Sequence, residues 1–137
     1  FDYSIKKQKV SSSKFYVADN SFLKTVAFNF SENAGKRLEN LVFIELKRRG
    51  FEIYYHAKNN ECDFVLKEGL KITKAIQVCI TIDSPTTKRR EVDGLLEALR
   101  EYKLKEGLIL TLDKEDEIKL NGKKIVIKPV WKWLLGK

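Results

Sequence analysis

Residues 61–66 and 75–82 hold the side chains whose types and spacing could do chemistry. In a β-strand, successive side chains point to opposite faces of the sheet. The alternation therefore predicts one apolar face, formed by Cys62, Phe64, Leu66, Ile76, Val78, Ile80 and Ile82. Asp63, Gln77 and Cys79 fall on the opposite face. We expect these three side chains to gather on one side of a buried sheet.

A further carboxylate, Glu39, lies in a segment with helical periodicity. Ser31 can cap this helix and Gly50 can end it. Its apolar residues recur at helical spacing: Ala34, Leu38, Leu41, Val42 and Leu46. Glu39 is at the margin of this stripe, one turn after Gly35. We therefore expect its carboxylate to project toward the sheet, although a solvated glutamate at the helix edge has the same pattern.

From about residue 14 to residue 135, the chain resembles the PD-(D/E)XK nuclease superfamily. The pattern of that superfamily is a glutamate on a helix, an aspartate on a strand and Glu-x-Lys on the next strand. Within that superfamily, the sequence most resembles the domain at the C-terminal end of archaeal AAA-type ATPases. The matching segments are KRLENLVF at 36–43, ECDFVL at 61–66, AIQV at 75–78, LKEGLI at 104–109 and VWKWLL at 130–135.

The resemblance implies an α/β fold of the restriction-endonuclease type. This fold has an αβββαβ core with a mixed sheet flanked by helices, followed here by a C-terminal β-hairpin and a short helix. Carried over residue by residue, Glu39 and Asp63 match the acidic positions of the family. Gln77 stands where the family has Glu or Asp, and Cys79 stands where it has Lys. The resemblance therefore implies a degenerate catalytic site of Glu39, Asp63, Gln77 and Cys79, with Glu39 and Asp63 as weak ligands for Mg²⁺.

The two altered positions argue against efficient hydrolysis of phosphodiesters. Mg²⁺ requires hard oxygen ligands, and the reaction needs a group that positions water or stabilises the developing charge. Gln77 offers only a neutral amide oxygen, and Cys79 has no permanent positive charge and favours soft ions. Loss of one preorganised stabilising group commonly costs a factor of roughly 10² to 10³ in rate.

Three functions are compatible with this sequence. The first is a catalytically depleted domain of an archaeal AAA-type ATPase that acts in nucleic-acid binding or in regulation and assembly. The second is an active metal-dependent DNA nuclease in which Lys74, Lys88, Arg89 or Arg90 supplies a relocated cation. The third is a protein-interaction domain that docks through its two tryptophans and a sheet edge. No GxxxxGK[ST] motif occurs, so ATP hydrolysis would belong to an N-terminal portion of the same polypeptide.

Two basic clusters flank the predicted helices. Lys and Arg at 47–49 complement the dipole at the C-terminus of the first helix, which is a sufficient structural explanation. Lys88, Arg89 and Arg90 instead open the second helix, where cations oppose the dipole. We therefore expect these three residues to bind nucleic acid through its phosphates, with a solvated surface as the alternative.

The remaining elements follow from periodicity and turn signals. Strands are predicted at 14–18, 51–56, 61–67, 72–83 and 107–112, with a short helical turn at 21–28 and a helix from Pro85 to about Lys103. The strands at 61–67 and 72–83 should form an antiparallel hairpin. A second hairpin, of 118–120 and 123–128, surrounds Asn121 and Gly122, which favour a tight turn. A short aromatic segment closes the chain, where packing over the core is the favoured role of its tryptophans.

The composition fits one soluble domain. At 137 residues, with 43% hydrophobic and 34% charged residues, the chain is long enough for a single core and has no apolar run that could cross a membrane. We expect a cytoplasmic protein, with residues 1–13 as a linker or arm and 14–137 as the domain. The chain has no Met, which suggests a fragment of a longer polypeptide. The net charge of +8 favours an anionic partner, while the abundance of Lys and Glu also fits heat adaptation.

The two cysteines and the single histidine offer little metal chemistry. Cys62 and Cys79 are predicted on opposite faces of their hairpin, so we expect two free thiols. One histidine and two cysteines without CxxC spacing are too few for a closed zinc site. His56 is predicted as an ordinary polar residue at the end of a strand.

Overall fold

The structure, a computed structural model, describes residues 34–136 of the chain. Its elements, in chain order, are α3 (Ala34–Arg48), β1 (Glu52–Ala57), β2 (Glu61–Glu68), β3 (Lys71–Val78), α4 (Pro85–Glu101), β4 (Glu106–Thr111), β5 (Asp116–Leu120), β6 (Lys123–Pro129) and α5 (Val130–Leu134). The predicted order of one helix, three strands, one helix, one strand and a hairpin is confirmed. The predicted strand at 14–18, the turn at 21–28 and the cap at Ser31 lie outside the described residues.

The six strands form one mixed sheet in the order β1-β2-β3-β4-β6-β5. Strands β1, β2 and β3 are antiparallel neighbours, β4 is parallel to both β3 and β6, and β5 is antiparallel to β6. The predicted hairpin of β2 and β3 is therefore confirmed. Asn121 and Gly122 both have positive φ, at 54° and 74°, as expected for the tight turn between β5 and β6.

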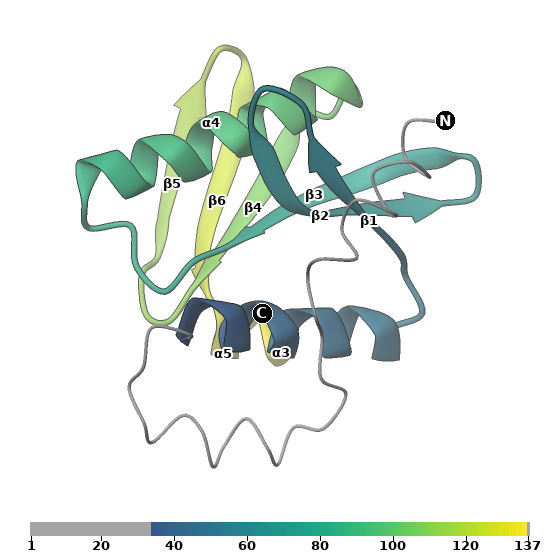
Figure 1. The fold of residues 1–137 in the computed structure, drawn as a ribbon, viewed down its shortest axis with the longest axis horizontal. Helices are drawn as coiled ribbons and strands as arrows, with labels where there is room; N and C mark the ends of the chain where they lie inside the picture. Colours follow the sequence, from purple (N-terminus) through teal and green to yellow (C-terminus); the bar gives the residue numbers. More distant parts are fainter. Residues whose placement is uncertain (1–33, 137) are drawn as a thin grey trace.

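Helices cover both faces of the sheet (Figure 1). One core cluster joins α3 and α5 to the sheet and includes Leu38, Val42, Phe64, Val78 and Trp133. A second cluster, built around Leu95 and Leu99 of α4, fills the space on the opposite face. Strand β4, near the middle of the sheet, is apolar from Gly107 to Leu110, as is typical of a strand covered on both faces.

A β-bulge in β2 changes the predicted distribution of side chains between the two faces. Tyr54 and His56 of β1 pair with Val65 and Cys62, so one intervening residue on β1 is matched by two on β2. The extra residue places Cys62 with the α4 cluster, although Phe64 and Leu66 remain with the α3 cluster. The prediction that Cys62 shares a face with Phe64 and Leu66 was wrong because strict alternation does not survive a bulge.

The end of β3 brings a second correction. The strand ends at Val78, not at residue 83, and the chain then runs toward α4. Ile82 consequently joins the α4 cluster instead of the α3 cluster. Cys79 also lies in the α4 cluster, so the two cysteines share a side of the sheet, contrary to expectation. Both are buried, and neither forms a disulfide within residues 34–136.

The C-terminus of α3 is fixed by its backbone and by its basic residues. Gly50 has φ of +85°, and hydrogen bonds from Gly50 N to Lys47 O and from Phe51 N to Leu46 O form the predicted glycine cap. Arg49 bonds the carbonyl oxygen of Trp133 at 3.0 Å and lies 4.4 Å from its ring centre. Part of the first basic cluster therefore ties α3 to α5.

Contacts within the last two turns of α3 reinforce this end of the helix. Arg48 and Arg49 both bind the carboxylate of Glu45. The bond from Arg48 is the main reason that the pKa of Glu45 falls to about 2, against the opposing effect of burial. Exposed ion pairs of this kind contribute little stability individually, so their role here is mainly positional.

His56 lies at the centre of a buried polar network between β1 and α4. Its ring is fully buried, with Nε2 2.7 Å from Glu97 Oε2 and Nδ1 3.1 Å from the Tyr102 hydroxyl. Glu97 also accepts bonds from the backbone and side-chain amides of Asn60. The predicted position near the end of a strand is confirmed, but the prediction of an ordinary polar residue was wrong, because His56 is fully buried and bonded to Glu97. A single sequence gives no sign that Glu97, some forty positions away, completes the pair.

Loss of the Glu97 charge should destabilise the fold in a pH-dependent way. Burial opposes ionisation of Glu97, but the bonds from His56 and Asn60 prevail and lower its pKa below the ordinary value of 4.5. A depressed pKa means that the stabilisation is complete above the ordinary value and disappears as pH falls through the lower one. Glu97→Gln should therefore reduce the free energy of unfolding by about 2 kcal/mol at pH 7.

Urea unfolding between pH 7 and pH 3 measures this effect. The difference between wild type and Glu97→Gln should shrink at the acidic end, because the wild-type carboxyl group is then protonated. Glu101→Gln is the matched control, since within residues 34–136 the carboxylate of Glu101 makes a 3.5 Å exposed contact with Lys58. A Glu97→Gln deficit that stays constant over this pH range would contradict the ionised pair.

Candidate functional site

A pocket of about 410 Å³ opens between the N-terminal ends of α3 and α4, next to the end of β3. Glu39 reaches it from α3, Asp63 from β2 and Cys79 from the residue after β3. Three of the four predicted site residues therefore line one pocket. Gln77, the fourth, does not line it and lies buried beneath α4.

Hydrogen bonds fix Asp63 and Gln77 across the β2–β3 pair. The side chain of Asp63 accepts a bond from Val78 N at 2.9 Å, and Asp63 N donates to Gln77 Oε1 at 2.8 Å. The last regular pair at this end is Phe64 with Ile76. The two side chains therefore replace backbone bonds where the ladder stops.

The amide nitrogen of Gln77 connects β2 to α4. Its Nε2 donates to Glu61 O at 2.9 Å and to Glu91 O at 3.1 Å. Gln77 is only 2% exposed, and its oxygen and nitrogen both bind the backbone. The side chain of Gln77 therefore has a structural role: it joins β2 and α4, and its amide oxygen accepts a bond from the backbone of Asp63.

Gly94 allows α4 to pack closely against β2 and the side chain of Gln77. A Cβ at Gly94 would lie 2.0 Å from Glu61 O and 2.7 Å from Gln77 Nε2. Contacts that short do not occur between non-bonded atoms, so only glycine permits the observed packing. The sequence alone does not single out Gly94, because a glycine within a helix pattern indicates a close approach only when its neighbour in space is known.

Cys79 is held in its neutral form. Burial is the main cause that raises its pKa to about 12, and the carboxylates of Glu91 and Asp63 add to the effect while Arg90 opposes it. At neutral pH the thiol therefore neither supplies a cation nor acts as a thiolate ligand.

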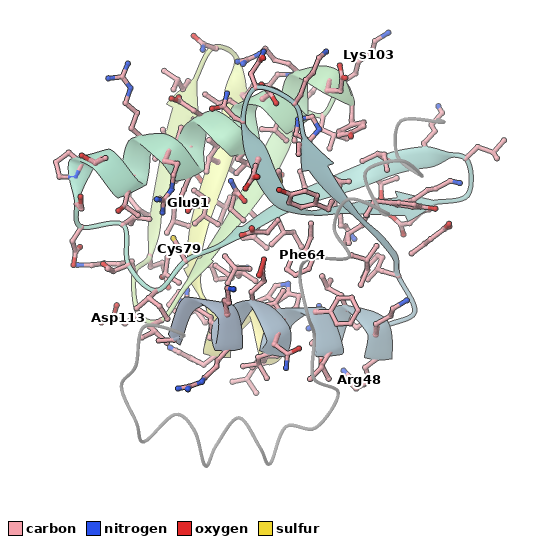
Figure 2. All side chains as sticks on the ribbon, viewed as in Figure 1. Arg48, Phe64, Cys79, Glu91, Lys103 and Asp113 are labelled. Carbon is pink, nitrogen blue, oxygen red and sulfur yellow. The ribbon has the colours of Figure 1, made fainter. Side chains whose placement is uncertain are left out.

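Acidic side chains outnumber basic ones in the lining of the pocket, with three carboxylates against Lys36 and Arg90. Burial raises the pKa of the neighbouring Tyr55 hydroxyl, and the charges of Glu61, Asp63 and Glu39 raise it further. Glu91, on α4, lines the same pocket as Glu39 and Asp63. Figure 2 shows Glu91 and Cys79 close together beside the first turns of α4. No sequence motif identifies Glu91 as a site residue, because only the position of α4 in the fold brings it to the pocket.

The four proposed donors of a relocated cation lie in different places. Arg90 lines the pocket, together with Lys36 of α3. Lys74 lies elsewhere, 4.8 Å from the ring centre of Phe51. Lys88 and Arg89 are near the start of α4 but do not line the pocket. Arg90 is therefore the only one of the four that shares a described pocket with Asp63.

The donor set does not fit a Mg²⁺ site of the nuclease type. Mg²⁺ demands near-octahedral oxygen ligation, usually through carboxylates and water. The amide of Gln77 is bound to the backbone on both sides, and Cys79 is a neutral sulfur donor. Within residues 34–136, no group of three or more His, Cys, Asp or Glu side chains is arranged to hold a metal ion.

The helices of residues 34–136 include none that is both long and apolar enough to span a bilayer. The longest, α4, has 17 residues and includes several charged side chains.

Comparison with known proteins gives two similar sequences. The chain is 37% identical over 145 aligned positions to an uncharacterized protein of Methanocaldococcus jannaschii, with 98% of the chain and 32% of that protein aligned. It is 29% identical over 126 positions to an uncharacterized protein of Haemophilus influenzae, covering 91% of the chain and 29% of that protein. The chain thus spans about a third of the length of these curated relatives. No family model and no solved structure matches it significantly.

Proposed function

We propose that this chain is a nuclease-like domain of the PD-(D/E)XK type that binds nucleic acid and does not cleave it. The observation that supports this most directly is the shared pocket of Glu39 and Asp63, because these residues come from the helix and the strand of the family pattern. The order of helices and strands is also that of the family core. The restriction-endonuclease type of the fold and the role of the domain within an archaeal AAA-type ATPase are parts of the same proposal.

The absence of cleavage follows from the two altered positions. The side chain of Gln77 is hydrogen-bonded to the backbone of three residues. It cannot turn into the pocket without breaking the hydrogen bonds through which it joins α4 to β2. Cys79 is a neutral thiol in place of a lysine. Arg90 brings a positive charge to the pocket, but it lies 3.3 Å from Glu91 and is mostly exposed, so it is not a preorganised replacement.

Nucleic acid would contact the pocket rim at the start of α4. The first turn of α4 has no acidic residue, and its cap residue Ser84 makes no side-chain bond to the helix. The partial positive charge of this helix end adds to that of Lys88, Arg89 and Arg90. Arg89 and Arg90 are 85% and 71% exposed, and within residues 34–136 they form ion pairs with Asp93 at 3.9 Å and Glu91 at 3.3 Å. Both guanidinium groups are therefore accessible to phosphates.

Anisotropy titrations with fluorescein-labelled duplex and single-stranded DNA and RNA test this proposal. Binding should weaken steeply between roughly 50 and 200 mM salt, because phosphate contacts release counterions. Arg89→Glu with Arg90→Glu should weaken binding roughly tenfold or more and lower the salt slope. Lys74→Glu with Lys105→Glu is the matched control, since it makes the same charge change at the far end of the sheet.

A cleavage assay with the same substrates in Mg²⁺ and Mn²⁺ completes the test. No cleavage above the level of an Asp63→Ala protein is expected. Activity that is lost in both Asp63→Ala and Glu39→Ala would favour an active nuclease with Arg90 as its cation. Absence of binding at low salt would rule out the nucleic-acid function altogether.

A further inference from the structure

Strands β3 and β4 diverge over their first halves. Their parallel ladder includes only Ile76 to Val78 paired with Leu108 to Leu110. In contrast, β4 pairs with β6 along its whole length, from Glu106 to Thr111. The split between β3 and β4 therefore lies within the sheet, on the side where both strands begin (Figure 1).

This split is occupied by a cavity of about 540 Å³. Its apolar lining comes from α3, α5 and four strands: Leu46, Leu66, Ile76, Leu108, Val126 and Trp133. Cavities of this volume with an apolar lining and a few polar groups are typical of binding sites. The cavity is at the end of the sheet opposite the Glu39–Asp63 pocket, and the two pockets have no lining residue in common. None of the four predicted site residues lines the cavity.

The edges of the split offer unpaired strand backbone. Within the described residues, 73–75 of β3 have no ladder partner on the β4 side, and 106–107 of β4 have none on the β3 side. Thr73, Lys74, Ala75, Glu106 and Gly107 all line the cavity. Unpaired strand edges are templates for an additional strand, and peptide recognition by strand addition uses them.

The charges around the split favour an acidic ligand. Arg49, Lys74, Lys105 and Lys128 line it, against the single carboxylate of Glu106. A negatively charged segment would therefore meet complementary charge. The rings that could stack on bases are already covered, since Lys74 lies over Phe51 and Arg49 over Trp133. This arrangement favours a peptide over single-stranded nucleic acid, which requires open aromatic faces.

We propose that the split between β3 and β4 binds an extended acidic peptide segment of a partner protein as an added strand along residues 73–75. Acidic side chains of the peptide face Lys74 and Lys105, and alternate apolar side chains enter the cavity beside Leu108 and Val126. This interaction is independent of nucleic-acid binding at the other end of the sheet, so either can fail without the other.

A matched set of synthetic peptides tests the proposal on the full chain. The probe is a fluorescein-labelled Glu-Val-Glu-Ile-Asp-Val-Glu peptide, measured by anisotropy. It should bind saturably, and roughly tenfold or more tighter than the version with lysine at the acidic positions. Methylation of alternate backbone nitrogens should abolish binding, because it removes the donors that strand pairing needs. Amide exchange at residues 73–75 should slow in the complex.

Variants locate the site and separate it from the nucleic-acid surface. Lys74→Glu with Lys105→Glu should weaken peptide binding roughly tenfold, whereas Arg89→Glu with Arg90→Glu should leave it unchanged. The proposal is overturned if the acidic peptide does not bind, or if the methylated peptide binds equally well. It is also overturned if oligothymidine displaces the peptide and slows the same amides, since the split would then be a nucleic-acid surface.

Discussion

Gly94→Ala should lower the free energy of unfolding by about 3 kcal/mol, the larger part of which is steric. The new methyl group would lie 2.0 Å from Glu61 O, a backbone atom that cannot rotate away. Helix α4 would have to move outward, and the bonds from Gln77 to Glu61 and Glu91 would then lengthen. The better helix propensity of alanine offsets about 1 kcal/mol at most.

Urea unfolding of Gly94→Ala and Gly35→Ala provides the comparison. Gly35 is also helical, but a Cβ there would have no atom within 4 Å. Gly35→Ala should therefore leave stability unchanged or raise it slightly, through helix propensity alone. Equal stability of the two variants would contradict the close packing of α4 on β2 at Gly94.

Local patterns were sufficient for most of the described elements. Gly50 and the Asn121–Gly122 pair define a helix end and a tight turn by their backbone freedom, and both have the expected positive φ. The apolar spacing in α3 and α4 and the uninterrupted apolar run of β4 correspond to the faces that are buried. These features depend on neighbours in sequence, so one sequence contains their signal.

The misplaced features depend on contacts between distant segments. Because of the bulge at residues 62–65, Cys62 lies on the opposite face from the one predicted. None of these four residues is a glycine, so the sequence gives no signal for the bulge. His56 depends on Glu97, and Glu91 reaches the pocket only through the course of α4. The sequence pattern did place Glu39 and Asp63 in positions that line one pocket, because it correctly gave both the helix and the strand.

Gln77→Glu, which restores the acidic residue of the family pattern, should destabilise the domain instead of restoring a nuclease. In the wild-type protein, Nε2 of Gln77 donates to two carbonyl oxygens, those of Glu61 and Glu91. A carboxylate has no donor for them, so it would place an uncompensated negative charge against two acceptors in a site that is 2% exposed. We expect a loss of about 3 kcal/mol in the free energy of unfolding at pH 8.

The pH dependence of Gln77→Glu separates charge from shape. Burial among acceptors raises the pKa of the new carboxyl group, so the protonated form, which can donate one bond, is favoured in the folded state. Stability should therefore be nearly normal at pH 4 and fall as pH rises, the reverse of the trend for Glu97. Gln77→Leu removes the same bonds without a titrating group, so its deficit should be similar at both pH values. If the Gln77→Glu protein is stable at pH 8 and cleaves DNA with Mg²⁺, the side chain at this position can turn into the pocket. That result would contradict the proposed function without cleavage.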